Sequence, residues 1–176
     1  MTDLELVEGT LAGRRQDFEV LVERHQRMLY GVALRYLHDA DAADEVVQAT
    51  FVSAYVHLPR FRREASFTTW LCGILLNQCR SARRRVRVRR EVALDDAPEA
   101  ALAGGTDEPD RAAERAALAR HIERLPPRQR SVLGLRLFAD LPFNEIARVE
   151  GISVNAAKVS YHLAVARLRA WFRRTP

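Results

Sequence analysis

Apolar residues recur at intervals of three and four along most of the chain, which is the spacing of one face of an α-helix. The pattern predicts a first helix over residues 15–37. The residues that repeat on one side of it are Phe18, Leu21, Val22, His25, Leu29, Val32, Ala33 and Tyr36. A second helix, capped by Asp41, is predicted to end near Leu58, and a third, capped by Ser66, to run to about Arg85. Because no segment shows the two-residue alternation of a strand, the first half is predicted to be a helical bundle.

The same spacing predicts a group of helices in the last third of the chain. One runs from about Asp110 to Arg124, and another begins with Pro127, which is tolerated in a first helical turn, and ends at Phe138. Two further helices, on either side of a tight turn at Gly151, complete the group. Glycine suits this turn because it adopts positive φ without a steric penalty.

The last two helices have the layout of a DNA-reading helix-turn-helix. The first follows Pro142, and Ser153 opens the second. We expect Val154, Ala157 and Tyr161 to face inward. The side chains expected to face outward are Asn155, Lys158, Val159 and His162. In this arrangement the second helix enters a major groove, so we favour DNA reading over a purely structural helix pair.

Charge divides the chain into three parts. Residues 1–90 carry a net charge of +4, residues 91–110 of −7 and residues 111–176 of +8. The acidic part also contains two prolines and two glycines and lacks apolar periodicity, as expected of a linker. We therefore predict an all-α protein of two small helical domains, 1–90 and 111–176, joined by a flexible acidic linker at 91–110.

Arginines are concentrated at the end of the third predicted helix. The cluster consists of Arg80, Arg83, Arg84, Arg85, Arg87, Arg89 and Arg90. It suits neutralisation of DNA phosphates, which we favour over a solvated helix end. The aromatic residues that precede it are Tyr55, Phe61, Phe67 and Trp70. Beside basic residues they suit stacking on unpaired bases, and at helical spacing they suit a core; the sequence favours neither interpretation.

An acidic and polar face is predicted on the second helix, where its members are Asp41, Asp44, Glu45 and Gln48. Such a face can meet a basic protein surface. The residue pattern alone, however, favours helix capping and solvation.

Other classes of protein are disfavoured. The histidines lack metal-ligand spacing, and the chain has no GxSxG elbow, phosphate-binding glycine loop or paired-cysteine zinc motif, so we expect neither catalytic residues nor a cofactor. Cys72 and Cys79 are expected about 10 Å apart on one helix face, beyond disulfide reach, as small core residues. No apolar run is long enough to span a membrane and the first residues are acidic, so we expect a cytoplasmic protein without membrane insertion.

Three stretches of the first half together resemble a known family. They are FEVLVERHQ at residues 18–26, DAADEVVQATF at 41–51 and RFRREASFTTWL at 60–71, the last followed by Asn77 and the basic helix. The first is similar to the opening conserved helix, the second to the polymerase-binding motif and the third to the promoter-melting motif of the bacterial extracytoplasmic-function (ECF) sigma factors. These proteins are the smallest class of RNA polymerase specificity subunits.

The second half resembles the same family. LPPRQR at residues 125–130 and GISV at 151–154 are similar to the family's second domain, and the resemblance extends from about Leu6 to Trp171. Several motifs in the same order and spacing are far more specific than any one of them.

The resemblance implies a role for each group of residues. The acidic face, Asp41, Asp44, Glu45 and Gln48, would bind the β′ subunit of core RNA polymerase instead of serving solvation. The residues implied to open and hold the −10 promoter element, with one base flipped from the stack, are Phe61, Arg62, Arg63, Phe67, Trp70, Asn77, Arg80, Arg83 and Arg84. The residues implied to read the −35 element are Ser153, Asn155, Lys158, Val159 and His162.

The resemblance also implies partners beyond promoter DNA, which is bound both double- and single-stranded. The second domain would contact the β subunit, the acidic linker would thread towards the polymerase active-site cleft, and an anti-sigma factor, often membrane-bound, would control the protein. No small-molecule substrate is implied. The recognition helix departs from the family's common KSRxxRA pattern, because Val159 and Leu163 stand where polar or arginine side chains usually touch DNA. Apolar contacts with thymine methyl groups are an alternative there.

We therefore expect an alternative sigma factor that binds core polymerase, directs it to specific promoters and promotes their melting. A helix-turn-helix regulator that binds duplex DNA alone would need a dimer interface, and no long heptad segment supplies one. It would also leave residues 15–90 unexplained. A nucleic-acid-processing enzyme would need catalytic groups that the sequence does not assemble.

Overall fold

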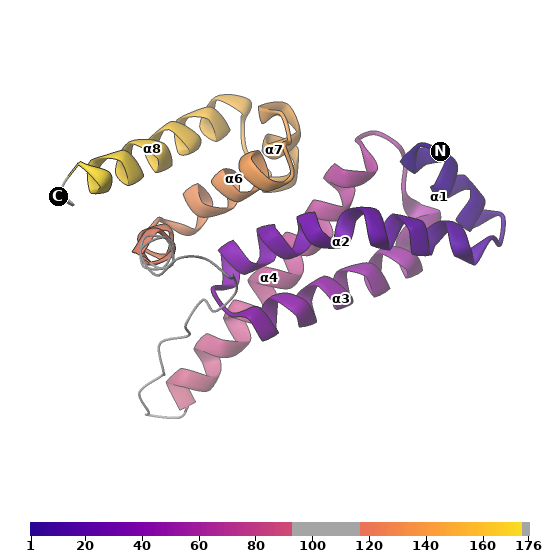
Figure 1. Ribbon diagram of the computed structural model, residues 1–176, viewed down its shortest axis with the longest axis horizontal. Helices are drawn as coiled ribbons and strands as arrows, with labels where there is room; N and C mark the ends of the chain where they lie inside the picture. Colours follow the sequence, from indigo (N-terminus) through magenta and orange to yellow (C-terminus); the bar gives the residue numbers. More distant parts are fainter. Residues whose placement is uncertain (93–116, 174–176) are drawn as a thin grey trace, which may run out of the picture.

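The computed structural model describes residues 1–92 and 117–173, and every regular element in these two ranges is helical. The elements, drawn in Figure 1, are α1 (Asp3–Leu11), α2 (Arg15–Leu37), α3 (Ala40–His57), the short 3-10 helix η1 (Leu58–Arg60), α4 (Phe67–Val92), α6 (Pro127–Phe138), α7 (Phe143–Glu150) and α8 (Val154–Phe172). Residues 117–123 are also helical. The predicted all-α fold is confirmed. The linker predicted at 91–110 lies, from residue 93 onward, outside the described residues, as does the start of the helix predicted from Asp110.

Helices α2, α3 and α4 form a long bundle that organises the first half of the chain (Figure 1). Its largest fully buried side chains are leucines, namely Leu21, Leu29, Leu71, Leu75 and Leu76. Burial of each contributes about 1.5–3 kcal/mol, so the apolar stripe on each helix determines how the three pack. Helix α2 has the bounds that its apolar spacing predicted.

The boundary between α2 and α3 differs from the prediction. Asp39 is the N-cap of α3, and its carboxylate accepts the Ala42 amide at 2.9 Å, so the prediction that Asp41 caps this helix is wrong. Asp41 lies in the first turn, where a negative charge is stabilised by the helix dipole. His38 adopts a left-handed conformation, φ 59°, so that α2 ends and α3 begins within two residues.

Helix α4 begins where the sequence predicted. The Ser66 hydroxyl accepts the Thr69 amide at 3.1 Å, which satisfies one of the free N–H groups of the first turn. The helix then continues to Val92, beyond the end predicted near Arg85. At about 1.5 Å per residue its 26 residues make it the longest element of the bundle, about 39 Å.

The helix-turn-helix is confirmed as a fold. Helix α6 begins with Pro127 in its first turn, as predicted, and α7 and α8 follow. Gly151 ends α7 in the left-handed conformation, φ 65°, and the Ser153 hydroxyl caps α8 by accepting the Ala156 amide at 3.1 Å. The turn therefore rests on a glycine for its backbone and on a serine for its hydrogen bond.

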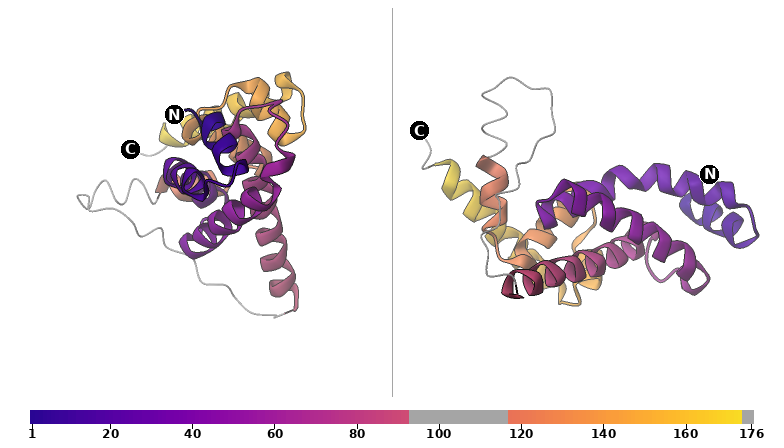
Figure 2. Two further views of the ribbon diagram at one scale, coloured as in Figure 1. Left: turned by 90° about the vertical axis from the view of Figure 1, so that its right-hand side faces the viewer. Right: turned by 90° about the horizontal axis from the view of Figure 1, so that it is seen from below.

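The two halves of the chain pack against each other. Figure 2 shows α6, α7 and α8 gathered at the end of the bundle that lies away from α1. Val132, Leu135 and Ile146 belong to the same buried cluster as the leucines of α2 and α4. The approach of α2 to this region is close, because a Cβ atom on Gly31 would lie 3.0 Å from Cδ1 of Phe138. A smaller cluster of Ile122, Leu125, Leu133 and Ala164 lies within residues 117–173.

Helix α1 was not predicted. A capping box begins it, in which the Thr2 hydroxyl accepts the Glu5 amide and the Glu5 carboxylate accepts the Thr2 amide. Leu6 and Val7 from this helix are completely or almost completely buried in the main core. The threonine and the glutamate three residues later are the signal that sequence analysis missed.

Candidate nucleic-acid and protein interfaces

The acidic face predicted on α3 is open to solvent. Asp41, Asp44, Glu45 and Gln48 are all exposed, while Ala43, Val46 and Val47 on the other side of the helix are buried. Residues three and four apart share one side of a helix, so the four polar residues form a continuous surface. This surface is available to a basic partner without any change in the fold.

The exposed side of α3 continues beyond the acidic residues as an apolar surface. Val52 and Val56 are 66% and 65% exposed, and Tyr55 is 48% exposed. A groove of about 290 Å³ beside them is lined by Phe18 and Phe51, among others. Sequence analysis did not include this apolar part. The spacing of Val52 and Val56 from Gln48, four and eight residues, was the available signal.

Three of the four predicted aromatic residues form one cluster at the start of α4, whereas Tyr55 packs against Phe18 of α2. The ring of Phe67 lies 5.9 Å from that of Phe61 and 5.8 Å from that of Trp70, and the rings of Phe61 and Trp70 are 5.2 Å apart. Phe67 is only 2% exposed, whereas Phe61 and Trp70 are half-buried. One ring of the cluster is therefore in the core, and two reach the surface.

A cavity of about 330 Å³ opens between α3 and α4 beside this cluster. Its lining is Ser53, His57, Arg60, Trp70, Ile74, Asn77 and Gln78. The cavity combines an indole ring with amide, hydroxyl and guanidinium groups, which is a combination suited to a planar, hydrogen-bonding ligand such as a base. Sequence analysis had selected Trp70 and Asn77 but missed Arg60, His57 and Gln78.

Two of the predicted DNA-contacting arginines are engaged in ion pairs. Arg63, in the loop before α4, pairs with Glu8 of α1 at 2.8 Å. Arg80 pairs with Glu150 at the end of α7 at 2.9 Å, and the Glu150 side chain is only 5% exposed. Neither pairing was predicted, because each joins residues far apart in the sequence.

Two other arginines of this surface, Arg83 and Arg84, also contact neighbouring side chains of the protein. The Arg83 guanidinium lies over the Tyr36 ring at 5.6 Å, and Arg84 donates to the Ser81 hydroxyl at 3.4 Å. Arg62 is exposed in the loop before α4. The side chains of Arg87, Arg89 and Arg90 lie outside the described residues.

The recognition helix α8 presents most of its predicted contacts to solvent. Asn155, Lys158, Val159 and His162 are exposed, as expected. Ser153 is exposed too, although its hydroxyl is used to cap the helix. Ala157 is buried and Tyr161 is half-buried, but Val154 is 41% exposed, so the prediction that it faces inward is wrong. Val154 is the first residue of α8, and no other turn of this helix precedes it to cover the side chain.

A buried arginine joins the two halves. Arg130 donates to the carbonyl oxygens of Glu123 at 2.8 Å, Leu125 at 3.1 Å and Tyr36 at 3.4 Å. His38 lies beside it, with Nδ1 3.3 Å from a Glu123 carboxylate oxygen. Burial, aided by the positive charge of Arg130, lowers the pKa of His38 to about 3. Arg130 ends the LPPRQR stretch, which had been selected only as a family motif.

The two cysteines are core residues, as predicted. Cys72 and Cys79 are free, fully buried thiols, and burial raises the pKa of each to about 12. In residues 1–92 and 117–173, no three His, Cys, Asp or Glu side chains are grouped so as to hold a metal ion. Among the helices of the same two ranges, none has the length and apolar character needed to cross a membrane.

Two family models match this chain, one on each side of the acidic segment. Residues 21–89 match the Sigma-70 region 2 family, and residues 115–168 match the Sigma-70 region 4 family. The first match contains the acidic face and the aromatic cluster, and the second contains the helix-turn-helix.

Curated relatives agree with these matches. The chain is 34% identical to the RNA polymerase sigma-H factor of Pseudomonas aeruginosa, over 84% of this chain and 81% of the relative. It is 30% identical to the ECF RNA polymerase sigma-E factor of Escherichia coli, over 90% of this chain and 87% of the relative.

Solved structures show the same arrangement of helices. CnrH, solved in complex with the cytosolic domain of CnrY, is 28% identical, with a TM-score of 0.74 over 99% of both chains. The sigma factor RpoE of Bartonella quintana, solved with the anti-sigma factor NepR, has the same fold at 20% identity, with a TM-score of 0.78 over 92% of this chain and 99% of that one. The chain belongs to the ECF sigma factors of the sigma-70 family. It is a transcription initiation factor, which acts with core RNA polymerase at promoter DNA.

Proposed function

We propose that this sigma factor holds its promoters at two points, with residues 1–90 at the −10 element and residues 111–176 at the −35 element, joined by residues 91–110. The binding surfaces differ in chemistry. The first half offers aromatic rings and a cavity to unpaired bases, and the second offers an exposed helix to a duplex major groove.

The cavity beside Trp70 carries this proposal. The site of about 330 Å³ combines an indole ring with amide groups, which suits an unpaired base better than a base pair inside a duplex. A base flipped out of the duplex presents a flat face for Trp70 and a hydrogen-bonding edge for Asn77. Arg62 in the loop before α4 and Arg80, Arg83 and Arg84 on α4 are the proposed contacts for the phosphates.

The acidic face of α3 is assigned to polymerase. Asp41, Asp44, Glu45 and Gln48 are exposed together on one side of the helix and lie within the region 2 match. A surface of this kind attracts a basic partner and orients it. The β′ subunit is the proposed partner for this face, and the β subunit is the proposed partner for the second half.

The −35 element is assigned to α8. Asn155, Lys158 and His162 offer hydrogen-bonding groups to base edges and phosphates, and Val159 offers an apolar contact to thymine methyl groups. Ser153 contributes mainly by fixing the start of the helix.

Regulation by an anti-sigma factor is proposed as well. CnrH, which shares 28% identity and almost its whole length with this chain, was solved with the cytosolic domain of CnrY bound. We place the protein in the cytoplasm, where core polymerase acts. Catalysis of RNA synthesis remains with that core enzyme, while this chain contributes recognition and strand opening.

Transcription in vitro with purified core polymerase tests the proposal. We expect promoter-specific initiation that requires this protein, with open-complex DNA detected by permanganate reactivity of thymines near the −10 element. Tight duplex binding by the free protein, together with no initiation on any genomic template, would point instead to an independent helix-turn-helix regulator.

A further inference from the structure

Helix α1 lies outside the region 2 match, which begins at residue 21, yet it is anchored to the promoter-melting part of the molecule. Its apolar side, Leu6 and Val7, is buried in the main core. Its polar side reaches α2 and the loop before α4. One connection runs through Asp3 and the other through Glu8.

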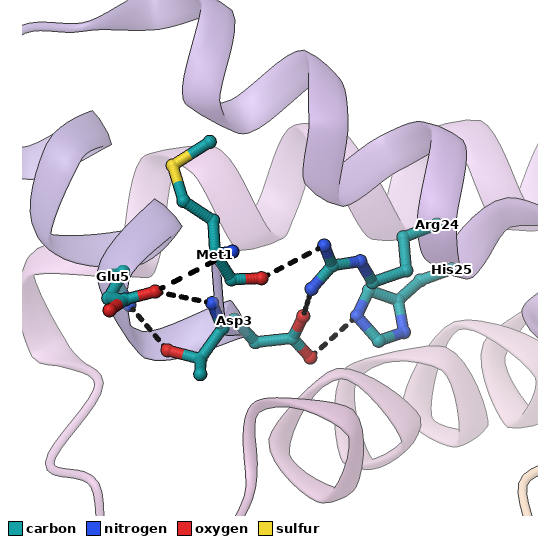
Figure 3. A network of polar contacts seen from close by, with 6 residues as sticks. Met1, Asp3, Glu5, Arg24 and His25 are labelled. Carbon is teal, nitrogen blue, oxygen red and sulfur yellow. Dashed lines mark hydrogen bonds and ion pairs between the residues drawn. The ribbon is translucent and has the colours of Figure 1, made fainter.

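Asp3 binds two neighbouring residues of α2 (Figure 3). One carboxylate oxygen accepts Arg24 Nη1 at 2.6 Å, and the other accepts His25 Nε2 at 2.8 Å. Arg24 also donates to the Met1 carbonyl oxygen at 3.2 Å. Because the carboxylate is held on both sides, it fixes the plane of the imidazole ring.

His25 transmits this contact to the aromatic cluster. Its ring is 7% exposed and lies edge-on to Phe67, with the centroids 5.5 Å apart and an angle of 62° between the planes. Phe67 in turn packs against Phe61 and Trp70. A continuous series of contacts therefore connects the N-terminal helix with the indole that lines the cavity.

The second connection reaches the loop before α4. Glu8 pairs with Arg63, whose backbone is left-handed at φ 59°, and the carbonyl of the next residue, Glu64, accepts a hydrogen bond from Arg148 of α7. The Glu8–Arg63 pair is exposed and is weak by itself. The Asp3 contact is better protected from solvent and carries the inference.

We propose that α1 acts as a brace for promoter opening, in which Asp3 and His25 are positioning residues for Phe67 and Trp70. The proposal rests on the assignment of the aromatic cluster to the −10 element. Neither Asp3 nor His25 contacts DNA in this account. They hold the rings in the orientation that accepts an unpaired base, so their loss slows strand opening without weakening the initial closed complex.

The test compares Asp3→Ala and Asp3→Asn in the full-length protein with core polymerase. Asparagine keeps an oxygen that can accept the His25 N–H, and alanine does not. We expect Asp3→Ala to slow opening about fivefold, the equivalent of losing one partly buried hydrogen bond, and Asp3→Asn to recover most of the rate. Affinities for core polymerase and for closed promoter DNA are expected to stay unchanged.

Two controls separate positioning from general damage. Glu5→Gln removes a charge from the same turn of α1 but leaves the Asp3 contact, and is expected to open promoters at the normal rate. In a Trp171→Phe background, Trp70 is the only tryptophan, and its emission is expected to shift with Asp3→Ala but not with Glu5→Gln.

The outcomes are distinguishable. A normal opening rate for Asp3→Ala overturns the brace, and so does a slow rate that comes with an equal loss of core affinity. Trp70→Ala in the same assay tests the underlying assignment. If it opens promoters normally, the aromatic cluster itself has been misassigned, whatever Asp3 does.

Discussion

Helix α8 exposes to solvent the side chains that we assign to the −35 element, whereas the surface around α4 that we assign to the −10 element holds several of its side chains in contacts within the protein. Asn155, Lys158 and His162 are exposed. By contrast, Phe67 is in the core and Arg80 is paired with Glu150. Reading a duplex major groove requires only a rigid exposed helix, but holding unpaired bases requires rings and charges that can change partners.

This difference in exposure indicates which side chains have to change partners when DNA binds. On the proposed assignment, α8 already exposes the side chains that would contact the −35 element. Arg80, in contrast, would have to leave Glu150 before contacting a phosphate, and Phe67 is buried behind the half-buried rings of Phe61 and Trp70. Part of the cost of melting is therefore located in the protein as well as in the DNA.

The largest expected effect is on core polymerase binding and concerns the acidic face of α3. Its side chains are exposed to solvent like those of α8, although they lie in the first half of the chain. Asp44→Arg places a positive charge where a basic partner is proposed to bind, and is expected to weaken core polymerase binding by about 100-fold or more. Co-purification with β′ and fluorescence anisotropy measure this. Glu23→Arg, the same change of charge at an exposed site of α2 outside the acidic face, is the control and is expected to bind normally.

The junction between the halves gives the next largest effect. His38 has a pKa of about 3 in the folded protein, because of burial first and of the positive charges of Arg130, Arg83 and Arg35 next. The unfolded state gains a proton below its ordinary pKa of about 6.5 and the folded state does not, so stability is lost as pH falls from about 6.5 towards 3. The expected loss at pH 5 is about 2 kcal/mol, measured by urea unfolding.

The control for this prediction is His38→Asn, because asparagine tolerates the left-handed backbone that residue 38 adopts. Its free energy of unfolding is expected to fall less between pH 7 and pH 5 than that of the wild-type protein. Equal pH dependence in both proteins would contradict the assignment to His38.

Trp70→Ala tests the −10 side of the comparison. Removal of the indole takes away the stacking platform, and opening is expected to slow about tenfold while duplex −35 binding stays constant. Rapid-mixing fluorescence with 2-aminopurine in the −10 element follows the opening. Parallel loss of −35 binding would show that the two sites are not separate.

Lys158→Ala tests the −35 side. Loss of one cationic contact is expected to weaken duplex binding about fivefold and to lower the slope of log affinity against log salt by about one. Titrations of a −35 duplex at several salt concentrations measure both quantities. Binding of a single-stranded −10 oligonucleotide is expected to remain normal, and a change there would break the comparison.

The smallest effect concerns Glu150→Gln, which releases Arg80. Because Arg80 is 41% exposed, the pair is weak, and its removal is expected to raise affinity for single-stranded −10 DNA about twofold. Asp140→Asn, which removes the partner of Arg136 instead, is the matched control. Lower affinity in Glu150→Gln would indicate that the pair orients Arg80 for DNA.

Local patterns were sufficient to predict most helices and the helix-turn-helix. The apolar period located α2, and Ser66, Pro127, Gly151 and Ser153 marked ends and turns, because each acts on backbone groups within a few residues. Two predictions of helix ends failed for local reasons. Asp39 and Asp41 were both candidate N-caps of α3, and Asp39 is the one that caps it. Helix α1 was missed because its main sequence signal is the capping box formed by Thr2 and Glu5.

Contacts between distant residues could not be predicted in this way. The Arg80–Glu150 pair and the contact of Arg130 with the Tyr36 carbonyl oxygen join residues that are 70 and 94 positions apart, and the local spacing of apolar residues does not predict such contacts. The family resemblance named the −10 residues but did not separate buried Phe67 from half-buried Trp70. That distinction comes only from packing.

The two buried thiols have a practical consequence for measuring these rearrangements. Burial raises the pKa of Cys72 and of Cys79 to about 12, so both thiols are protonated at neutral pH. Maleimide dyes react with thiolates that solvent can reach, so the natural cysteines are expected to stay unlabelled in the folded protein. Probes attached through cysteines introduced at Glu23 and Arg128, which are exposed and lie outside the proposed binding surfaces, can then report the distance between the two halves without removal of either native thiol.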